Sequence, residues 1–323
     1  MTQLPSILHV MNGHSMIPIV AAAQLPGTMT IYADALHEGP VPGGLGDAEM
    51  REVRGRFLAS PDQSWQAIAH SFGETDAAIV EAQRQGEVVF WFEHDLFDQL
   101  LLIRHLARLD DDTRPHTSLV CIDRFPGIEP FLGLGQLSGP QLASLFPARV
   151  AVSAAQADLA RRAWHAFTAP EPTAINALLA AGMDALPFLR AALLRHLQEF
   201  PSIATGLPAT EQGILEILAA GPLAPSALFR AAQRRETCFF IGDTSFRDRL
   251  DRLAAGPQPL VQLQFDAAGI LPPGLVSITG DGRDVLAGRV DWLMIQRFDR
   301  WLGGVHVTPG SAWRRDGDQV RAV

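Results

Sequence analysis

Short apolar runs alternate with stretches of helical periodicity through the first half of this chain. Runs typical of buried strands occupy residues 6–11, 28–32, 87–92 and 118–123. The stretches between them carry apolar side chains at helical spacing, separated by turns rich in Pro and Gly. Alternation of this kind favours a parallel sheet with helices on both faces. We therefore predict an α/β domain over residues 1–150, built on a Rossmann-like and mostly parallel sheet.

Polar residues follow each of the four predicted strands. The carboxyl ends of parallel strands share one edge of the sheet, and ligands bind in the crevice beyond that edge. The residues that we place there are Asn12, His14 and Ser15 after the first strand, Asp34, His37, Glu38 and Gly39 after the second, Glu93, His94, Asp95, Asp98 and Gln99 after the third, and Asp123 and Arg124 after the fourth. Their convergence predicts a functional site, and it depends on the strands being parallel.

The junction that begins at Glu93 admits two interpretations. Asp95 is placed to cap the helix that follows, and Asp98, three residues later, makes a variant of the capping box. Capping leaves Glu93 and His94 unexplained, because they end a buried strand and a buried carboxylate is costly unless it is paired. We expect Glu93 and His94 to lie at the centre of the site.

Histidines and carboxylates are the residue types that general acid–base catalysis and divalent-metal sites require. We assign catalytic roles to Glu93, His94, Asp95 and Asp34. Residues that we expect to bind substrate are Asn12, His14, Ser15, His37, Glu38, Gly39, Asp98 and Gln99. Candidate ligands for a divalent metal are His37, His94 and Asp34. The chain has no HExxH or GxSxG motif, so a hydrogen-bonded network of the same residues is the alternative.

Some polar or Gly-rich features have simpler structural explanations. His9 lies inside the first strand and is expected to be a satisfied core residue. For Ser15 the alternative to a site role is a cap on the helix that begins at Met16, and for Asp34 it is a turn. The segment FLGLGQ at residues 131–136 resembles a dinucleotide-binding loop only superficially, because it lacks a third glycine and a clear preceding strand.

Composition limits the chemistry that is available. All 26 basic residues are arginine, which excludes mechanisms that need a lysine for phosphate binding or Schiff-base formation. Tyr32 is the only tyrosine, and Cys121 and Cys238 are too few for a disulfide framework. The net charge of −9 disfavours broad nucleic-acid binding. If the protein is an enzyme, its chemistry therefore depends on His, Asp, Glu, Ser and Arg side chains, or on a bound metal or cofactor.

The chain has no apolar run of the roughly 18–20 residues that a membrane span needs. Its start, MTQLPSILHV, lacks the pattern of a secretory signal. We expect a cytoplasmic protein with no membrane partner, whose main partner is a small-molecule ligand or substrate. A homodimer is left open.

The second half of the chain is predicted in three parts. A helical connecting segment covers residues 151–206, a winged-helix-like domain covers 207–292, and a tail over 293–323 packs on the body. The third predicted helix, SFRDRLDRL, interleaves arginine with aspartate, which is typical of intrahelical ion pairs. A helix that reads DNA normally presents a more basic face, so DNA binding is open but not favoured.

Several segments of the chain resemble a known bacterial family. They are ILHVMNGHSM, YADALHEGPVP, VVFWFEHDLFDQLLLIRHL and GLGQLS in the first half, and LPFLRAALLRHLQEFPS, GLPATEQGILEIL and WLGGVHV in the second. These segments resemble the bacterial domain-of-unknown-function family 1835 and the C-terminal region that accompanies it. The family carries no established activity. The resemblance implies an aspartate where His14 stands, so either the site is altered here or His14 binds a metal in its place.

Three functional hypotheses follow. The first is a hydrolase or group transferase that acts on a small polar, phosphorylated or nucleotide-like molecule by acid–base or metal-assisted chemistry. The second is a transcriptional regulator that senses a ligand in the α/β domain and binds DNA through the winged helix. The third is a non-catalytic scaffold, which gains weight if His14 reflects a lost activity.

Overall fold

The computed structural model describes residues 6–238, 240–264 and 269–323, and it divides into two compact units. The first unit contains the chain up to Ala192 together with Gly303–Val305. The second contains Leu193–Leu302 and His306–Val323. The division falls inside α8 (Leu189–Leu197), so the predicted connecting segment 151–206 is shared between the two units.

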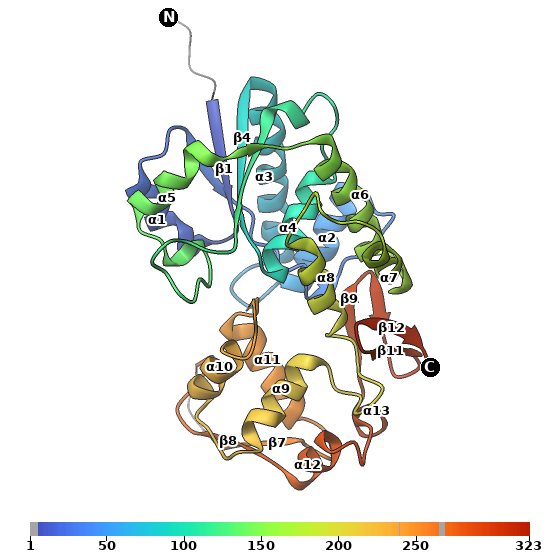
Figure 1. Cartoon of the computed structure of the whole chain (residues 1–323). Helices are drawn as coiled ribbons and strands as arrows, with labels where there is room; N and C mark the ends of the chain where they lie inside the picture. Colours follow the sequence, from blue (N-terminus) through green and yellow to red (C-terminus); the bar gives the residue numbers. More distant parts are fainter. Residues whose placement is uncertain (1–5, 239, 265–268) are drawn as a thin grey trace, which may run out of the picture. The chain divides into compact units, whose positions relative to one another are not determined.

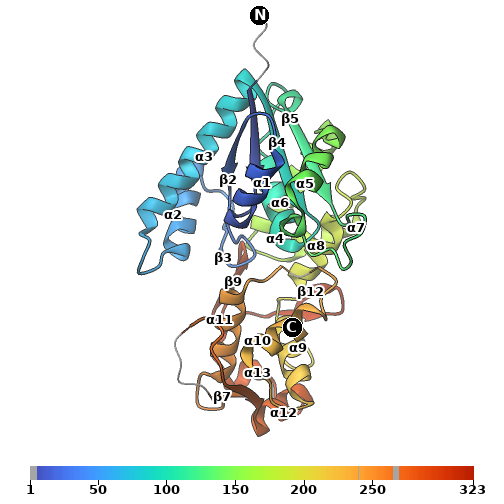
Figure 2. The ribbon, with the colours of Figure 1, turned by 90° about the vertical axis from the view of Figure 1, so that its left-hand side faces the viewer.

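A five-stranded sheet organises the first unit (Figures 1 and 2). Its strands, in the order β2-β1-β4-β5-β6, are β2 (Thr28–Ile31), β1 (Ser6–Met11), β4 (Gly86–Glu93), β5 (Thr117–Ile122) and β6 (Val150–Ala151). The first four are parallel to one another, and only β6 is antiparallel. The prediction of an α/β fold with a mostly parallel sheet is therefore confirmed.

Helices cover both faces of this sheet. Figure 1 shows one pair of helices on one side of the strands and a second set on the other. The first pair is α1 (Ile17–Ala23) and α5 (Gly139–Leu145), and the second set is α3 (Trp65–Gln85), α4 (Leu96–Leu106) and α6 (Ala154–Thr168). Helix α2 (Asp47–Leu58) packs on α3, and α7 (Thr173–Ala180) packs on α6. A two-residue strand, β3 (Gly39–Pro40), lies in the Pro/Gly-rich loop after β2.

Strand β4 is apolar on both sides because both of its faces are covered. Trp91 packs with α1 and α5 in one core, beside Met11 and Val120. Phe90 and Phe92 point to the other face, where both rings contact His105 of α4. A strand buried on both faces needs a continuous apolar run rather than an alternating one. The period of two then directs the Glu93 side chain to the same face as Trp91.

His9 is a satisfied core residue, as predicted. Trp91 donates its indole N–H to Nδ1 of His9 at 3.0 Å. The other ring nitrogen, Nε2, lies 2.9 Å from the carbonyl oxygen of Pro26 and donates to it, because Nδ1 is the acceptor. Burial lowers the pKa of His9 from its ordinary value, so the ring is neutral near pH 7.

The second unit begins with three helices and a hairpin. In chain order these are α9 (Ala209–Leu218), α10 (Pro225–Gln233), α11 (Asp243–Ala254) and the antiparallel strands β7 (Val261–Gln264) and β8 (Leu275–Ile278). Leu223, between α9 and α10, pairs with Val276 of β8 through two backbone hydrogen bonds. The chain continues through α12 (Gly280–Leu286), α13 (Trp292–Ile295), β9 (Arg300–Gly303), β10 (Val305–Val307) and the β11 (Trp313–Asp316)–β12 (Gln319–Ala322) hairpin.

A group of charged side chains that are buried, apart from the partly buried Arg195, lies in the second unit, and we call it the ion-pair cluster. Glu199 accepts from Arg195 at 2.9 Å and from Arg300 at 2.8 Å, and Arg249 lies 3.3 Å away. Arg300 also donates to Glu211 at 3.2 Å. Burial alone would raise the pKa of Glu199, but the three arginines hold it well below its ordinary range. Glu199 is therefore ionised, and Arg195 also pairs with Glu236 at 2.7 Å, so three carboxylates face the three arginines.

Among the described residues, no helix combines the length and the apolar character that crossing a bilayer demands.

Candidate acidic site at the carboxyl edge of the sheet

The site lies where neighbouring strands β1 and β4 send their connections to opposite sides of the sheet. The chain leaves β1 through α1 toward β2, and it leaves β4 through α4 toward β5. Such a switch in direction opens a crevice outside the carboxyl ends of the two strands. Asn12 follows β1 directly, and Glu93 is the last residue of β4.

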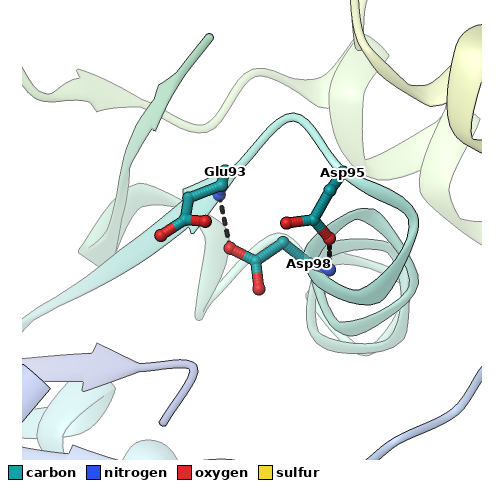
Figure 3. Close-up of side chains that lie close together, drawn as sticks. All are labelled: Glu93, Asp95 and Asp98. Carbon is teal, nitrogen blue, oxygen red and sulfur yellow. Dashed lines mark hydrogen bonds between the residues drawn. The ribbon is translucent and has the colours of Figure 1, made fainter. Parts of the chain in front are cut away.

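Three carboxylates converge at the end of β4 and the start of α4 (Figure 3). One oxygen from each of Glu93, Asp95 and Asp98 lies within 4.8 Å of the other two. Their residues are 6%, 7% and 0% exposed, respectively. Within the described parts of the chain, no arginine or histidine forms an ion pair with any of the three. We call this group the acidic site.

Capping of α4 places two of these carboxylates. Asp95 is the N-cap and accepts a hydrogen bond from the N–H of Asp98 at 3.0 Å, which confirms its predicted capping role. Asp98 accepts from the N–H of Glu93 at 2.5 Å, so its side chain reaches back to the end of the strand. Figure 3 shows both bonds. The capping that the sequence suggested as an alternative to a site therefore builds the site.

Two amide side chains hold the acidic site together. Asn12 donates from Nδ2 to both oxygens of Asp98, at 2.9 and 3.1 Å. Gln99 donates to the carbonyl oxygen of Glu93 at 2.7 Å and contacts the thiol of Cys121 at 3.4 Å. These contacts bring together five of the residues predicted from the sequence: Asn12, Glu93, Asp95, Asp98 and Gln99.

A segment that the sequence did not assign to the site covers Glu93. The N–H of Leu134 donates to Oε1 of Glu93 at 2.5 Å. Gly133 has φ +152°, and a Cβ atom there would lie 2.2 Å from Oε2 of Glu93. Only glycine allows the backbone to approach the carboxylate this closely. The signal was present in FLGLGQ, where it resembled a dinucleotide loop.

The environment raises the pKa of all three carboxyl groups. Burial, followed by the charge of Asp95, raises the pKa of Glu93 to about 8, and burial raises the pKa of Asp95 to about 6. Burial and the two neighbouring carboxylates raise the pKa of Asp98 well above its ordinary value. The free site therefore retains protons near pH 7, because three uncompensated charges cannot coexist so close together.

An all-oxygen donor set suits a hard divalent cation such as Mg²⁺ or Mn²⁺. Glu93, Asp95 and Asp98 supply three carboxylates from one strand end and one helix start, and burial strengthens their need for a counter-charge. In the described part of the chain, this is the one group of three or more His, Cys, Asp or Glu residues close enough to share a metal ion. The predicted ligand set of His37, His94 and Asp34 does not form such a group.

Asp34 forms a buried ion pair instead. Arg54 of α2 donates to Asp34 at 2.7 and 3.0 Å, and both residues are 1% exposed. The same guanidinium donates to the carbonyl oxygens of Ala35, Glu38 and Pro40. Asp34 and Arg54 together thus fix the loop after β2.

His37 and Gly39 lie in this loop. The His37 ring is buried and contacts the ring of Phe97, in the first turn of α4, with 5.8 Å between ring centroids. Gly39 has φ +71°, and a Cβ atom there would lie 2.4 Å from the Phe57 ring. The glycine is therefore required by the turn and by the close approach of α2.

His94 points toward aromatic side chains. Its ring lies 6.3 Å from the Phe131 ring and 6.1 Å from the Phe188 ring. Burial lowers the pKa of His94, partly offset by Asp123 and by a hydrogen bond to the Ile122 carbonyl. Adjacent residues of an extended chain point in different directions, which explains why the side chains of Glu93 and His94 contact different groups.

His14 and Ser15 are exposed and lie in a 3₁₀ turn over His14–Met16. Met16 is the N-cap residue of α1, and Ser15 makes no capping hydrogen bond there, so the predicted cap by Ser15 is wrong. His14 lines a separate cavity of about 560 Å³ beside β2 and α3. Neither residue contacts the acidic site through a described hydrogen bond or ion pair.

No protein-family model matches the chain, and no curated protein sequence is similar to it.

Proposed function

We propose that the protein is a cytoplasmic hydrolase or group transferase that acts on a small phosphorylated or nucleotide-like molecule at the acidic site. The observation that carries this proposal is the convergence of three buried carboxylates at the switch point of a parallel sheet, none of them in an ion pair with a described Arg or His side chain. A purely structural network would gain more stability from an arginine partner, as Glu199 does in the second unit.

Glu93, Asp95 and Asp98 would hold one divalent cation. When bound, such a cation neutralises phosphate charge and makes water a better nucleophile near pH 7. Asn12 and Gln99 orient the carboxylates, and Leu134 fixes the Glu93 side chain through its backbone N–H. Acid–base catalysis by the same carboxyl groups is the metal-free version, with protonated Glu93 as acid and Asp95 as base.

The aromatic residues beside the strand end support a nucleotide-like substrate. The rings of Phe131 and Phe188 contact His94, which directly follows Glu93. Partly buried aromatic faces are suited to stack on a flat heterocyclic ring. A single nucleotide could then place its phosphate at the acidic site and its base on these rings.

The proposal is tested by Mn²⁺ titration calorimetry and by hydrolysis of a panel of nucleotides and phosphate monoesters. We expect one Mn²⁺ per chain in the wild type and at least about a tenfold loss of affinity in Asp95→Asn, which keeps the helix cap. Asp123→Asn is the matched control, because Asp123 directly follows β5 and pairs with Arg124 rather than with the three carboxylates. Absence of metal binding together with unchanged turnover in Asp95→Asn and Glu93→Gln would rule out the proposal.

A second candidate, a ligand-sensing regulator, has one observation in its favour. The order of three helices and a hairpin, with Leu223 between α9 and α10 bridging to Val276 of β8, resembles a winged-helix arrangement. Two features of α11 weigh against DNA recognition: Arg249 is buried in the ion-pair cluster, and Arg247 pairs with Asp251. We therefore rank a protein-contacting role for this unit above DNA binding. Salt-dependent binding to a specific DNA sequence would reverse that ranking.

A further inference from the structure

A cavity of about 330 Å³ lies within the second unit, beside α9. Its walls come from α9, the end of α10 and the residues after it, α11 and the segment before it, and strand β11, with Gln198 after α8. Polar and apolar side chains share the lining, which includes Gln198, Ile241, Phe246 and Arg315. The volume is at the lower end of the roughly 300–1,000 Å³ typical of small-molecule sites.

Two acidic residues line this cavity, and each already has a cationic partner. Glu216 pairs with Arg235, which also lines the cavity. Glu236 accepts two hydrogen bonds from Arg195, at 2.9 and 2.7 Å. Neither carboxylate is left to balance the charge of the remaining cation, Arg315.

Arg315 has a fixed backbone and an unsatisfied side chain. Its N–H donates to the carbonyl of Pro201 at 2.7 Å, and its own carbonyl accepts from Ile203 at 3.0 Å. Among the described residues, its guanidinium has no ion-pair or hydrogen-bond partner, although Nε is buried. Burial lowers the pKa of Arg315 from its ordinary value. A buried donor without a partner is costly, so a bound group that accepts from it would be strongly stabilised.

Gly213 leaves the α9 wall of the cavity bare. It lies inside the helix, where glycine is less favourable than alanine. A Cβ atom at this position would meet nothing closer than Nε of Arg235, 4.0 Å away, so packing does not require glycine here. Its effect is to leave room beside the cavity.

We propose that this cavity binds a small organic monocarboxylate, with Arg315 as the anchoring residue. The planar guanidinium offers parallel N–H donors that match the two oxygens of a carboxylate. Among the described charged side chains that line the cavity, Arg315 alone has no ion-pair partner, although the charges of Glu199 and Asp318 act on it from farther away. A single negative charge on the ligand therefore suits this cavity better than the two charges of a phosphate dianion. Ile241 and Phe246 give apolar surface for the body of the ligand, and Gln198 adds an amide.

The test is calorimetric titration of the full-length protein with benzoate, hexanoate, inorganic phosphate and benzamide. We expect benzoate or hexanoate to bind one to one, and phosphate and benzamide to bind at least about tenfold more weakly. Arg315→Met is expected to weaken carboxylate binding at least about tenfold. The carboxylate affinity of Arg315→Lys should lie between those of the wild type and Arg315→Met, because an ammonium keeps the charge but not the planar pair of donors.

Two further variants separate ligand loss from misfolding. Gly213→Leu fills the cavity while improving helix propensity, so we expect a folded protein that no longer binds carboxylate. Arg321→Met, which removes an exposed ion pair with Asp316 on the same hairpin, should leave binding unchanged. The proposal is overturned if benzamide or phosphate binds as tightly as benzoate. It is also overturned if neither carboxylate binds at about 10 mM, or if both Arg315→Met and Gly213→Leu bind normally.

Discussion

The two units treat buried carboxylates in opposite ways. Glu199 of the ion-pair cluster is surrounded by three arginines, and the pKa of its carboxyl group is held well below the ordinary range. Glu93 of the acidic site has two carboxylates as its neighbours, and its pKa is raised to about 8. Both side chains are buried, so burial alone does not separate a structural carboxylate from a candidate functional one. The charge of the neighbours does.

The ion-pair cluster and the acidic site also differ in whether their charges are balanced by other side chains. The ion-pair cluster carries its own counter-charges and requires nothing from outside the chain. The acidic site can reduce its repulsion only by holding protons or by binding a cation. We infer that the first contributes to stability and the second is available for chemistry.

The largest expected effect on stability comes from replacing Glu199 of the ion-pair cluster with glutamine, which has nearly the same shape but no charge. Glu199→Gln should lower the free energy of unfolding by about 3–5 kcal/mol, because it leaves buried arginines without a counter-charge. Chemical denaturation followed by amide hydrogen exchange in α9 and α11 measures the loss. Asp284→Asn, in an exposed pair with Arg289, is the control and should cost less than about 0.5 kcal/mol. A loss below about 1 kcal/mol in Glu199→Gln would contradict the structural role of the cluster.

An intermediate effect is expected when the pH is changed, because the stabilities of the two units should respond to pH in opposite directions. Unfolding lets Glu93 release its proton near pH 4.5, whereas the folded site retains it up to about pH 8. The stability of the first unit should therefore be highest below pH 4.5 and fall as pH rises to 8, by at most about 1.4 kcal/mol per pH unit for each retained proton. Glu199, whose pKa is lowered, stabilises the second unit above its ordinary pKa and loses that contribution as pH falls.

The dependence of stability on pH can be measured separately in the two units by hydrogen exchange, from the amides of β4 and α4 for the first unit and of α9 and α11 for the second. Saturating Mg²⁺ should flatten the slope of the first unit, because a bound cation lets the carboxyl groups ionise without repulsion. Parallel slopes in the two units would show that the acidic site does not retain protons.

The smallest effect is expected from Glu93→Gln. A glutamine resembles the protonated carboxyl group and still accepts from the N–H of Leu134, so the free energy of unfolding at pH 7 should change by less than about 1 kcal/mol. Thermal and chemical denaturation without added metal measure this change. A loss as large as that of Glu199→Gln would mean that Glu93 is an ionised structural carboxylate, and the contrast between the units would disappear.

The strands and their polar ends could be predicted because both follow from local patterns. The apolar run at 87–92 and the abrupt change at Glu93 indicate a buried strand and its end, and a parallel sheet then brings Asn12 to the same edge. Asp95 was recognisable as a helix cap from its position alone.

Side-chain partners from distant segments could not be predicted in the same way. Asp34 looked like an equivalent member of the site, but Arg54 on the following helix neutralises it. Glu93 and His94 looked like a pair, but the extended chain sends them to different neighbours. The role of Gly133 depends on a backbone approach between residues 40 positions apart, which no local pattern encodes.

The hydrogen bond from Trp91 to His9 gives the sheet an internal reporter. Because Nδ1 accepts from the indole and Nε2 donates to Pro26, the imidazole is locked in one tautomer and its two nitrogens are magnetically inequivalent. Burial of the neutral ring preserves this state below the pH at which an ordinary imidazole is protonated. His9 and Trp91 lie on the two strands that carry Asn12 and Glu93. Their nuclear resonances would therefore record any shift of β1 against β4 without an alteration to the acidic site itself.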